Sequence, residues 1–70
     1  MMNRLILQKS IYEWDKIARA LDAYSSMCDL NVEEQDYAYV LSVVNCKIDS
    51  QIIIKEFENY LIGISGAYGF

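Results

Sequence analysis

Histidine is missing from this sequence, and the only cysteines are Cys28 and Cys46. Two thiols fall short of the ligand set of an ordinary zinc or iron–sulfur site, so we expect no metal and no cofactor within one chain. No serine or cysteine has a histidine to activate it as a nucleophile. Glu56 and Glu58 are two residues apart on a predicted helix and therefore lie on different faces, which does not suit paired acid–base catalysis. We expect the protein not to be an enzyme.

The two cysteines are expected to be free thiols. A hairpin turn centred near Gln35 would place Cys28 opposite a residue between Tyr39 and Val43, which leaves Cys46 about 10 Å farther along. A disulfide needs Cα atoms within about 7 Å of each other. No apolar run of the sequence is long enough to span a bilayer, and the run in its first ten residues is too short for a secretory signal. We therefore expect a cytoplasmic protein with reduced cysteines, and no membrane partner.

Basic residues are few and scattered. Six Lys and Arg stand against ten Asp and Glu, which gives a net charge of −4 and a pI near 4.5. Nucleic acid is therefore not an expected partner. The acidic residues of the stretch Asp29 to Asp36 lack the glycine-punctuated spacing of a calcium loop, and a solvated turn between strands is their ordinary setting.

The chain is short but rich in apolar residues. A domain of this length buries only about 60% of its unfolded surface. Hydrophobic residues nevertheless make up 54% of the 70 residues, and six residues are tyrosines. Such an excess fits a surface that is partly an interface, so we expect a protein or peptide partner, in a homo-oligomer or a hetero-complex. Without proline, repeats or a linker, residues 1–70 form one predicted α+β domain, with a loose tail at 66–70.

The hydrophobic pattern predicts the order strand, helix, strand, strand, helix. The aliphatic run Arg4 to Gln8 predicts the first strand. Ser10 and Glu13 have the spacing of a capping box, and apolar residues then recur every three or four positions as far as Tyr24, which predicts a helix. From Cys28 to Glu33 the pattern alternates and predicts a strand with an acidic outer face.

The run Tyr37 to Val44 is apolar on both faces and predicts the central strand of a sheet. Asp49 or Ser50 is expected to cap a second helix that includes the triplet 52–54 and ends near Gly63. The predicted fold is a small β-α-β-β-α domain. Its three-stranded mixed sheet has the order 1-3-2, and both helices cover one face.

The aromatic residues have two interpretations: core packing, or a binding surface in which tyrosine offers contact area at low entropic cost. A free strand edge would suit the second interpretation, because it accepts an extended peptide or a second copy of the chain. The predicted binding residues are Tyr37, Tyr39, Asp29, Asn31 and Glu33.

Several positions resemble a known family. Tyr12 leads into a helix with Ile17 and Ala20, a hairpin follows, and the closing helix carries Phe57 and Asn59. This order resembles the small D proteins of His-Xaa-Ser peptide-maturation systems over about Leu5 to Ile62. The family's closing signature matches here at Asn59, which joins the predicted binding residues, whereas Gly63, Ile64 and Ser65 replace its later Leu-Arg-Glu. The resemblance implies a bacterial accessory protein that serves radical enzymes in modifying a ribosomally made peptide.

Two functions therefore remain open. The first is a non-catalytic accessory or recognition module for a peptide or partner protein, in the setting of peptide maturation. The alternative is a small acidic inhibitor or regulator, of the phage or mobile-element type, that occupies a basic surface of a larger target.

Overall fold

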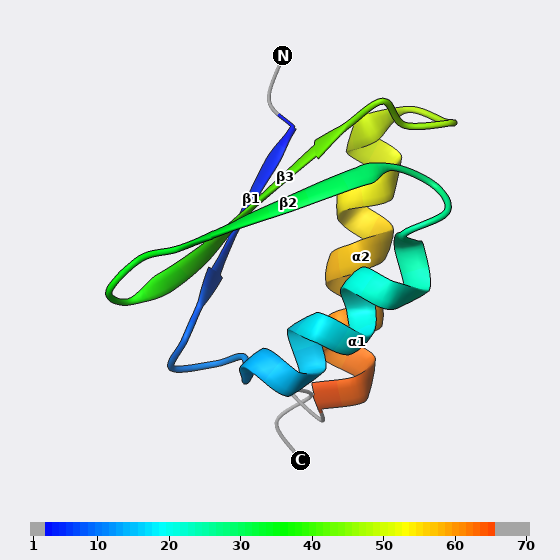
Figure 1. Cartoon of the computed structure of the whole chain (residues 1–70). Helices are drawn as coiled ribbons and strands as arrows, with labels where there is room; N and C mark the ends of the chain where they lie inside the picture. The colour runs from blue at the N-terminus through cyan, green and yellow to red at the C-terminus, as the bar shows by residue number, and fades with distance from the viewer. Residues whose placement is uncertain (1–2, 66–70) are drawn as a thin grey trace.

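A computed structural model gives the fold and describes residues 3–65 (Figure 1). The elements are β1 (Arg4–Gln8), α1 (Trp14–Tyr24), β2 (Asp29–Glu34), β3 (Ala38–Val44) and α2 (Ser50–Ser65). The predicted α+β order and the strand order β1-β3-β2 are confirmed. The tail predicted at 66–70 lies outside the described residues.

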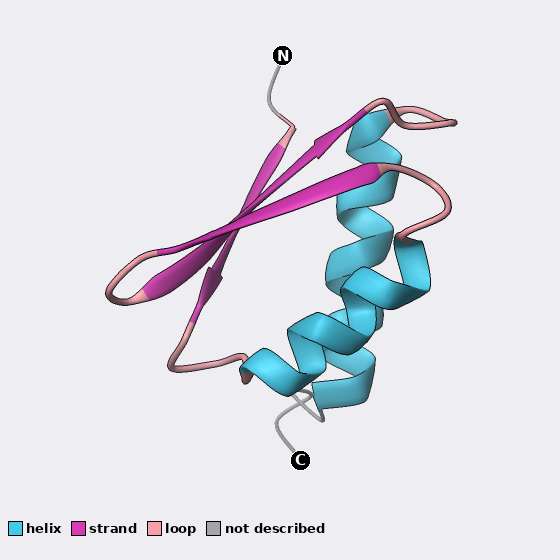
Figure 2. Cartoon of the chain, viewed as in Figure 1, coloured by secondary structure: helices cyan, strands magenta, loops and turns pink. Residues whose placement is uncertain are grey.

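Every pair of neighbouring strands is antiparallel. β1 pairs with β3 in the register Arg4↔Ser42 to Gln8↔Ala38, and β2 pairs with β3 in the register Asp29↔Val44 to Glu34↔Tyr39. The predicted mixed sheet is therefore wrong in this respect: the sheet is antiparallel throughout, because the two outer strands, which run in the same direction, are separated by β3 and do not pair with each other. Both helices lie on one side of the sheet, as predicted (Figure 2).

The core lies between the sheet and the two helices. β3 supplies Leu41 and Val43, which are fully buried, so its central role is confirmed. The other row of β3 faces away from the helices, and its Val44 is 39% exposed. Fully buried side chains from the other elements complete this core: Leu7, Ile17, Ala20, Ile53, Phe57 and Leu61.

The start of α1 differs from the prediction. The N-cap is Glu13, without a side-chain cap hydrogen bond, and the backbone N–H groups of Lys16 and Ile17 donate to its carbonyl at 3.1 Å each. The capping box at Ser10 does not form because a turn precedes the helix, in which Ile11 N donates to Gln8 O at 3.0 Å. The chain needs this turn to leave β1 before the helix can begin.

The start of α2 follows the prediction. The backbone N–H of Gln51 donates to Asp49 Oδ1 at 2.8 Å, so Asp49 satisfies one of the free donors of the first turn. The triplet 52–54 is helical, and the helix continues through Gly63 to Ser65. Neither helix of residues 3–65 combines the length and the apolar character needed to cross a bilayer.

The prediction of free thiols is wrong in this structure, because Cys28 and Cys46 form a disulfide. The register pairs Asp29 with Val44, which places the turn later than Gln35 and brings Cys28 beside Asn45. Asn45 then takes a positive φ of 54°, so the chain bends back and the Cα atoms of the two cysteines come within 4.1 Å. Asparagine tolerates this left-handed conformation better than most residues.

Candidate functional site

The free edge of β2 is the first part of the candidate site. β2 stands at the end of the strand order, so only one of its sides is paired with β3. The backbone N–H and C=O groups on the other side are available to a further strand. Helix α1 lies beside this edge on the same face of the sheet as α2 (Figure 1).

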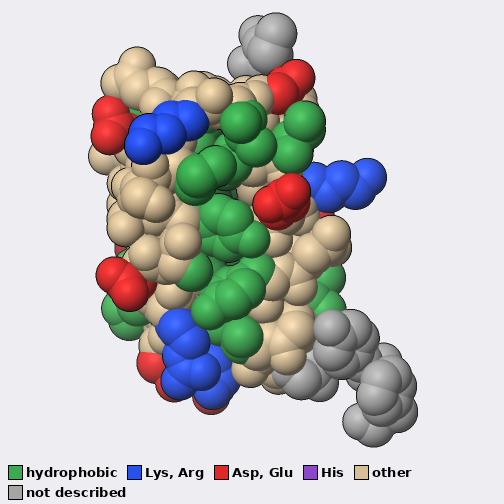
Figure 3. Space-filling view, turned by 90° about the vertical axis from the view of Figure 1, so that its right-hand side faces the viewer, with side chains coloured by type: hydrophobic (Ala, Val, Ile, Leu, Met, Phe, Trp, Pro, Cys, Tyr) green, Lys and Arg blue, Asp and Glu red, His purple; other side chains and the backbone are tan. Residues whose placement is uncertain are grey.

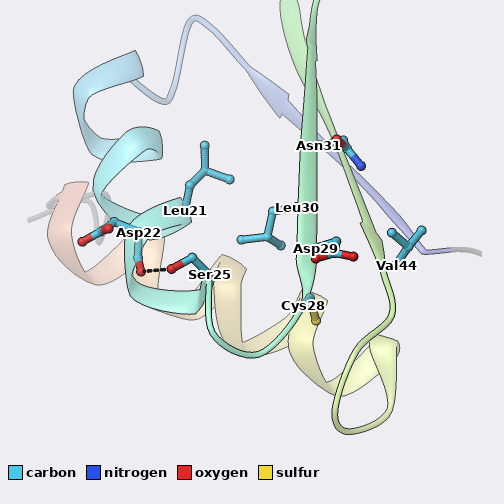
Figure 4. A pocket seen from close by; sticks show the side chains of 8 residues that line it. All are labelled: Leu21, Asp22, Ser25, Cys28, Asp29, Leu30, Asn31 and Val44. Carbon is cyan, nitrogen blue, oxygen red and sulfur yellow. Dashed lines mark hydrogen bonds between the residues drawn. The ribbon is translucent and has the colours of Figure 1, made fainter.

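A hollow of about 740 Å³ lies between the end of α1 and the start of β2. Leu21 from the helix and Leu30 from the strand both extend into the space between α1 and β2 and form its apolar part (Figure 4). The other residues that line this hollow come from the end of α1, from the loop after it and from the sheet: Asp22, Ser25, Cys28, Asp29, Asn31 and Val44. Ser25 Oγ donates to the backbone carbonyl of Asp22 at 3.0 Å, which fixes the helix end at this hollow.

A second hollow of about 360 Å³ lies between the other end of β2 and the start of α1, lined by Trp14, Val32, Glu34 and Tyr39. The rings of Trp14 and Tyr39 have centroids 5.1 Å apart and are tilted by 41°. Because α1 starts near the end of β2 and ends near its beginning, the two hollows lie along the same strand. We call this line of two hollows the α1–β2 groove.

The rim of the groove is acidic. Asp22, Asp29 and Glu34 are exposed beside the hollows, and Asp36 follows in the turn to β3, whereas the exposed Glu33 lies on the sheet face opposite the helices. Asn45 Nδ2 donates to Asp29 Oδ2 at 2.8 Å, and Lys9 Nζ to Glu34 Oε2 at 2.7 Å. Residues 3–65 contain no group of three or more metal-ligating side chains that would suit a metal ion. The charge therefore favours a cationic partner over a chelated ion.

The predicted binding residues fall into three places. Asp29, Asn31 and Glu33 are exposed on β2, but only Asp29 and Asn31 line the first hollow, because Glu33 lies on the sheet face opposite the helices. Tyr37 is 85% exposed in the turn before β3, while Tyr39 is half-buried against Trp14. The structure does not bring Asn59 to this site: it is exposed on α2, whereas the groove is formed by α1, β2 and β3.

Sequence reasoning missed the helical side of the groove. Trp14 and Leu21 have the spacing of core positions on α1, yet Trp14 is 47% exposed and Leu21 half-buried. The spacing of apolar residues every three or four positions shows which residues share a face of α1. It does not show that α1 leaves part of β2 uncovered. A signal was present in Trp14 itself, because a large aromatic residue at a helix start often lies at the boundary of the core.

Two further surfaces are apolar. The sheet face opposite the helices exposes Ile6 at 65%, beside a hollow of about 460 Å³ lined by Arg4, Leu5, Ile6, Glu33, Gln35 and Val40. On the helix side, hydrophobic side chains form a stripe with charged ones along its margins (Figure 3). Ile48 and Ile52, before and at the start of α2, are 43% and 48% exposed.

Comparison with protein-family models, with curated proteins and with solved structures gives no match for this chain.

Proposed function

We propose that this chain is a non-catalytic recognition module that holds an extended peptide segment of a partner on the free edge of β2, beside the α1–β2 groove. The observation that carries the proposal is an unpaired strand edge with hollows alongside it. A segment added to this edge gains backbone hydrogen bonds, which give affinity without dependence on sequence. The resemblance to peptide-maturation proteins supports a peptide as the partner, such as the precursor of a modified peptide.

Selectivity would come from the two hollows. Leu30, Val32 and Glu34 alternate with outward residues along β2, so they stand about 7 Å apart on the groove side. A segment paired with β2 has the same spacing, so side chains two or four residues apart would enter the two hollows. The leucine-lined hollow suits an apolar side chain, and the acidic rim suits flanking lysine or arginine.

The alternative function uses acidic residues of β2 and of the turn that follows it. Asp29, Glu33 and Asp36 would fit a basic surface of a larger folded target, and the chain would then act as an inhibitor or regulator. The two functions differ in what is recognised: an extended segment pairs with backbone groups of β2, whereas a folded basic surface meets only the carboxylates. Binding to the carboxylates alone would weaken steeply with salt.

Self-association would use a different surface, the sheet face opposite the helices. Ile6 and Val40 form the apolar middle of this face, with Arg4 on the β1 side and Glu33 on the β2 side. A second copy related by a two-fold axis along the strands would set Arg4 of each copy near Glu33 of the other. Sedimentation of wild type and Ile6→Lys tests this: we expect a dimer that the substitution dissociates, and a monomeric wild type contradicts it.

The peptide function is tested by NMR titration of the amide groups with a capped hexapeptide of alternating lysine and valine. We expect shifts at the amides of β2, and little change at β1. The same peptide with glutamate in place of lysine should bind several-fold more weakly, because it meets the acidic rim. Absence of shifts along β2, or equal shifts along β1, would contradict the proposal.

Charge reversal at the rim gives a second test with a matched control. Asp22→Lys should weaken binding of the lysine peptide several-fold, since Asp22 lines the first hollow. Glu56→Lys makes the same change of charge on the exposed surface of α2 and should leave the affinity nearly unchanged. Equal losses in both variants would indicate attraction by net charge, without a defined groove.

A further inference from the structure

At the second hollow of the groove, the side chains of Glu34 and Tyr39 already contact an ammonium group, that of Lys9. Lys9 follows β1 directly, and its backbone N–H continues the sheet by donating to Tyr37 O at 2.9 Å. Tyr39 lies on the central strand and Glu34 is its partner in the register of β2. The three side chains therefore come from the residue after β1, from β3 and from β2, and that of Lys9 crosses β3 to reach β2.

The ammonium of Lys9 meets two kinds of partner. Its Nζ atom lies 5.0 Å from the centroid of the Tyr39 ring and 2.7 Å from Glu34 Oε2. An aromatic face and a carboxylate are the two groups that proteins commonly combine to bind alkylammonium ions. The hydrogen bond that Lys9 donates to Glu34, opposed in part by desolvation, raises the pKa of Lys9.

Trp14 completes one wall of this corner. Its ring lies 5.1 Å from that of Tyr39, centroid to centroid, and the residue is 47% exposed. Tryptophan is the strongest cation–π partner among the aromatic side chains. The hollow of about 360 Å³ between Trp14, Val32 and Glu34 leaves space for a further side chain next to these groups.

We infer that the corner formed by Trp14, Tyr39 and Glu34 is a binding site for the ammonium group of a lysine side chain in the partner segment, and that Lys9 occupies this site in the free protein. The inference rests on the proposed function for the path by which the segment arrives. Beyond the proposed function, a lysine of the partner segment is the anchoring residue, and Lys9 competes with it for the same site. A lysine next to the end of β2 takes over Glu34 and the aromatic faces, and Lys9 turns to solvent.

The exchange is energetically easy. The side chain of Lys9 is 30% exposed and that of Glu34 is 66% exposed. Exposed ion pairs contribute little net stability, since water replaces most of what is lost. Lys9 therefore occupies the site in the free protein but is easily displaced. The lysine of the partner segment gains an additional contact with the face of the Trp14 ring.

The test compares two capped hexapeptides of alternating valine and threonine. One has a single lysine at the fourth position, and the other has norleucine there, which keeps the alkyl chain but removes the charge. Affinities are measured by NMR titration of the β2 amides and by fluorescence of Trp14, the single tryptophan of the chain. We expect about tenfold tighter binding of the lysine peptide, with a change in Trp14 emission.

Variants of the corner give the decisive readout. Lys9→Met removes the internal competitor, so it should raise the affinity for the lysine peptide several-fold and leave that for the norleucine peptide unchanged. Glu34→Gln should abolish the preference for lysine. Lys16→Met, which removes a charge from α1 outside the groove lining, is the matched control and should change neither affinity. Circular dichroism shows that each variant is folded.

The outcomes separate this inference from the proposed function. If both peptides shift the β2 amides with equal affinity in wild type and in Lys9→Met, the ammonium site is wrong and the peptide-binding module stands. If neither peptide shifts them, both proposals fail. If an arginine peptide binds as tightly as the lysine peptide, the site does not select a primary ammonium.

Discussion

Cys28 and Cys46 are joined across the end of the β2–β3 hairpin, with their Cα atoms 4.1 Å apart. Cys28 is 5% exposed and belongs to the core, and it also lines the hollow beside Leu21. The backbone of the loop supports the same connection, because Lys47 N donates to Met27 O at 2.9 Å. The disulfide therefore fixes one end of the α1–β2 groove to the loop that precedes α2.

Removal of the disulfide should lower stability strongly. The bond closes a loop with a sequence separation of 18, for which the chain-entropy model gives about 3 kcal/mol. We expect Cys46→Ala to lower the free energy of unfolding in urea by about this amount. Wild type in excess reductant should match the variant, and adding reductant to the variant should change nothing. Equal stability of oxidised and reduced wild type would contradict a stabilising disulfide.

The two faces of β3 should respond differently to substitution. Leu41 is fully buried, so Leu41→Ala leaves a cavity and should lower the free energy of unfolding by about 3 kcal/mol. Val40 is half-buried on the face without helices, so Val40→Asp should leave the domain folded. Thermal unfolding followed by circular dichroism measures both. An unfolded Val40→Asp variant would mean that another layer covers this face.

The conformation of Asn45 gives a comparison within one position. Its φ of 54° is unfavourable for a residue with a Cβ atom and free of penalty for glycine. Asn45→Gly and Asn45→Ala both lose the hydrogen bond to Asp29, so the difference between them isolates the backbone term. We expect the glycine variant to be about 1 kcal/mol more stable than the alanine variant in urea unfolding. The opposite order would exclude a left-handed residue here.

Tyr24 should make stability fall at alkaline pH. Burial, followed by Glu56 and Tyr60, raises the pKa of its phenol above 10.0 in the folded protein. Because the pKa of Tyr24 is higher in the folded than in the unfolded protein, the protonated phenol favours folding. This contribution to the free energy of unfolding is complete below pH 10.0 and is lost as the pH rises through the pKa of the folded protein. Unfolding free energies measured from neutral to strongly alkaline pH should show a shallower decline in Tyr24→Phe.

Local patterns predicted most of the fold. The two apolar faces of β3 identified the central strand. The cap of α2 was predicted as Asp49 or Ser50, and Asp49 accepts the hydrogen bond; a cap could be predicted because it depends only on the residues that follow it. The errors arose where one segment meets another. The capping box at Ser10 is a local motif, but the turn that leaves β1 prevented it.

The sequence could suggest only the strand side of the candidate site. The exposure of Asp29, Asn31 and Glu33 was predicted because alternation along one strand reveals its exposed row, and their role in binding stays a prediction. The groove needs the distance between α1 and β2, and no periodicity within either element encodes it. The disulfide was missed for a similar reason: its formation depends on the hairpin register and on the left-handed bend at Asn45.

The position of β3 between its neighbours also suggests an order of assembly. β2 and β3 are consecutive and form a local hairpin, whereas β1 pairs with β3 only after α1 and β2 have been traversed. Contacts between distant parts of a chain close slowly, because their loop entropy is lost before they gain stability. β1 is therefore the strand expected to join last and to open first. Its transient departure would uncover the far edge of β3, which offers a second molecule a place to exchange its own first strand.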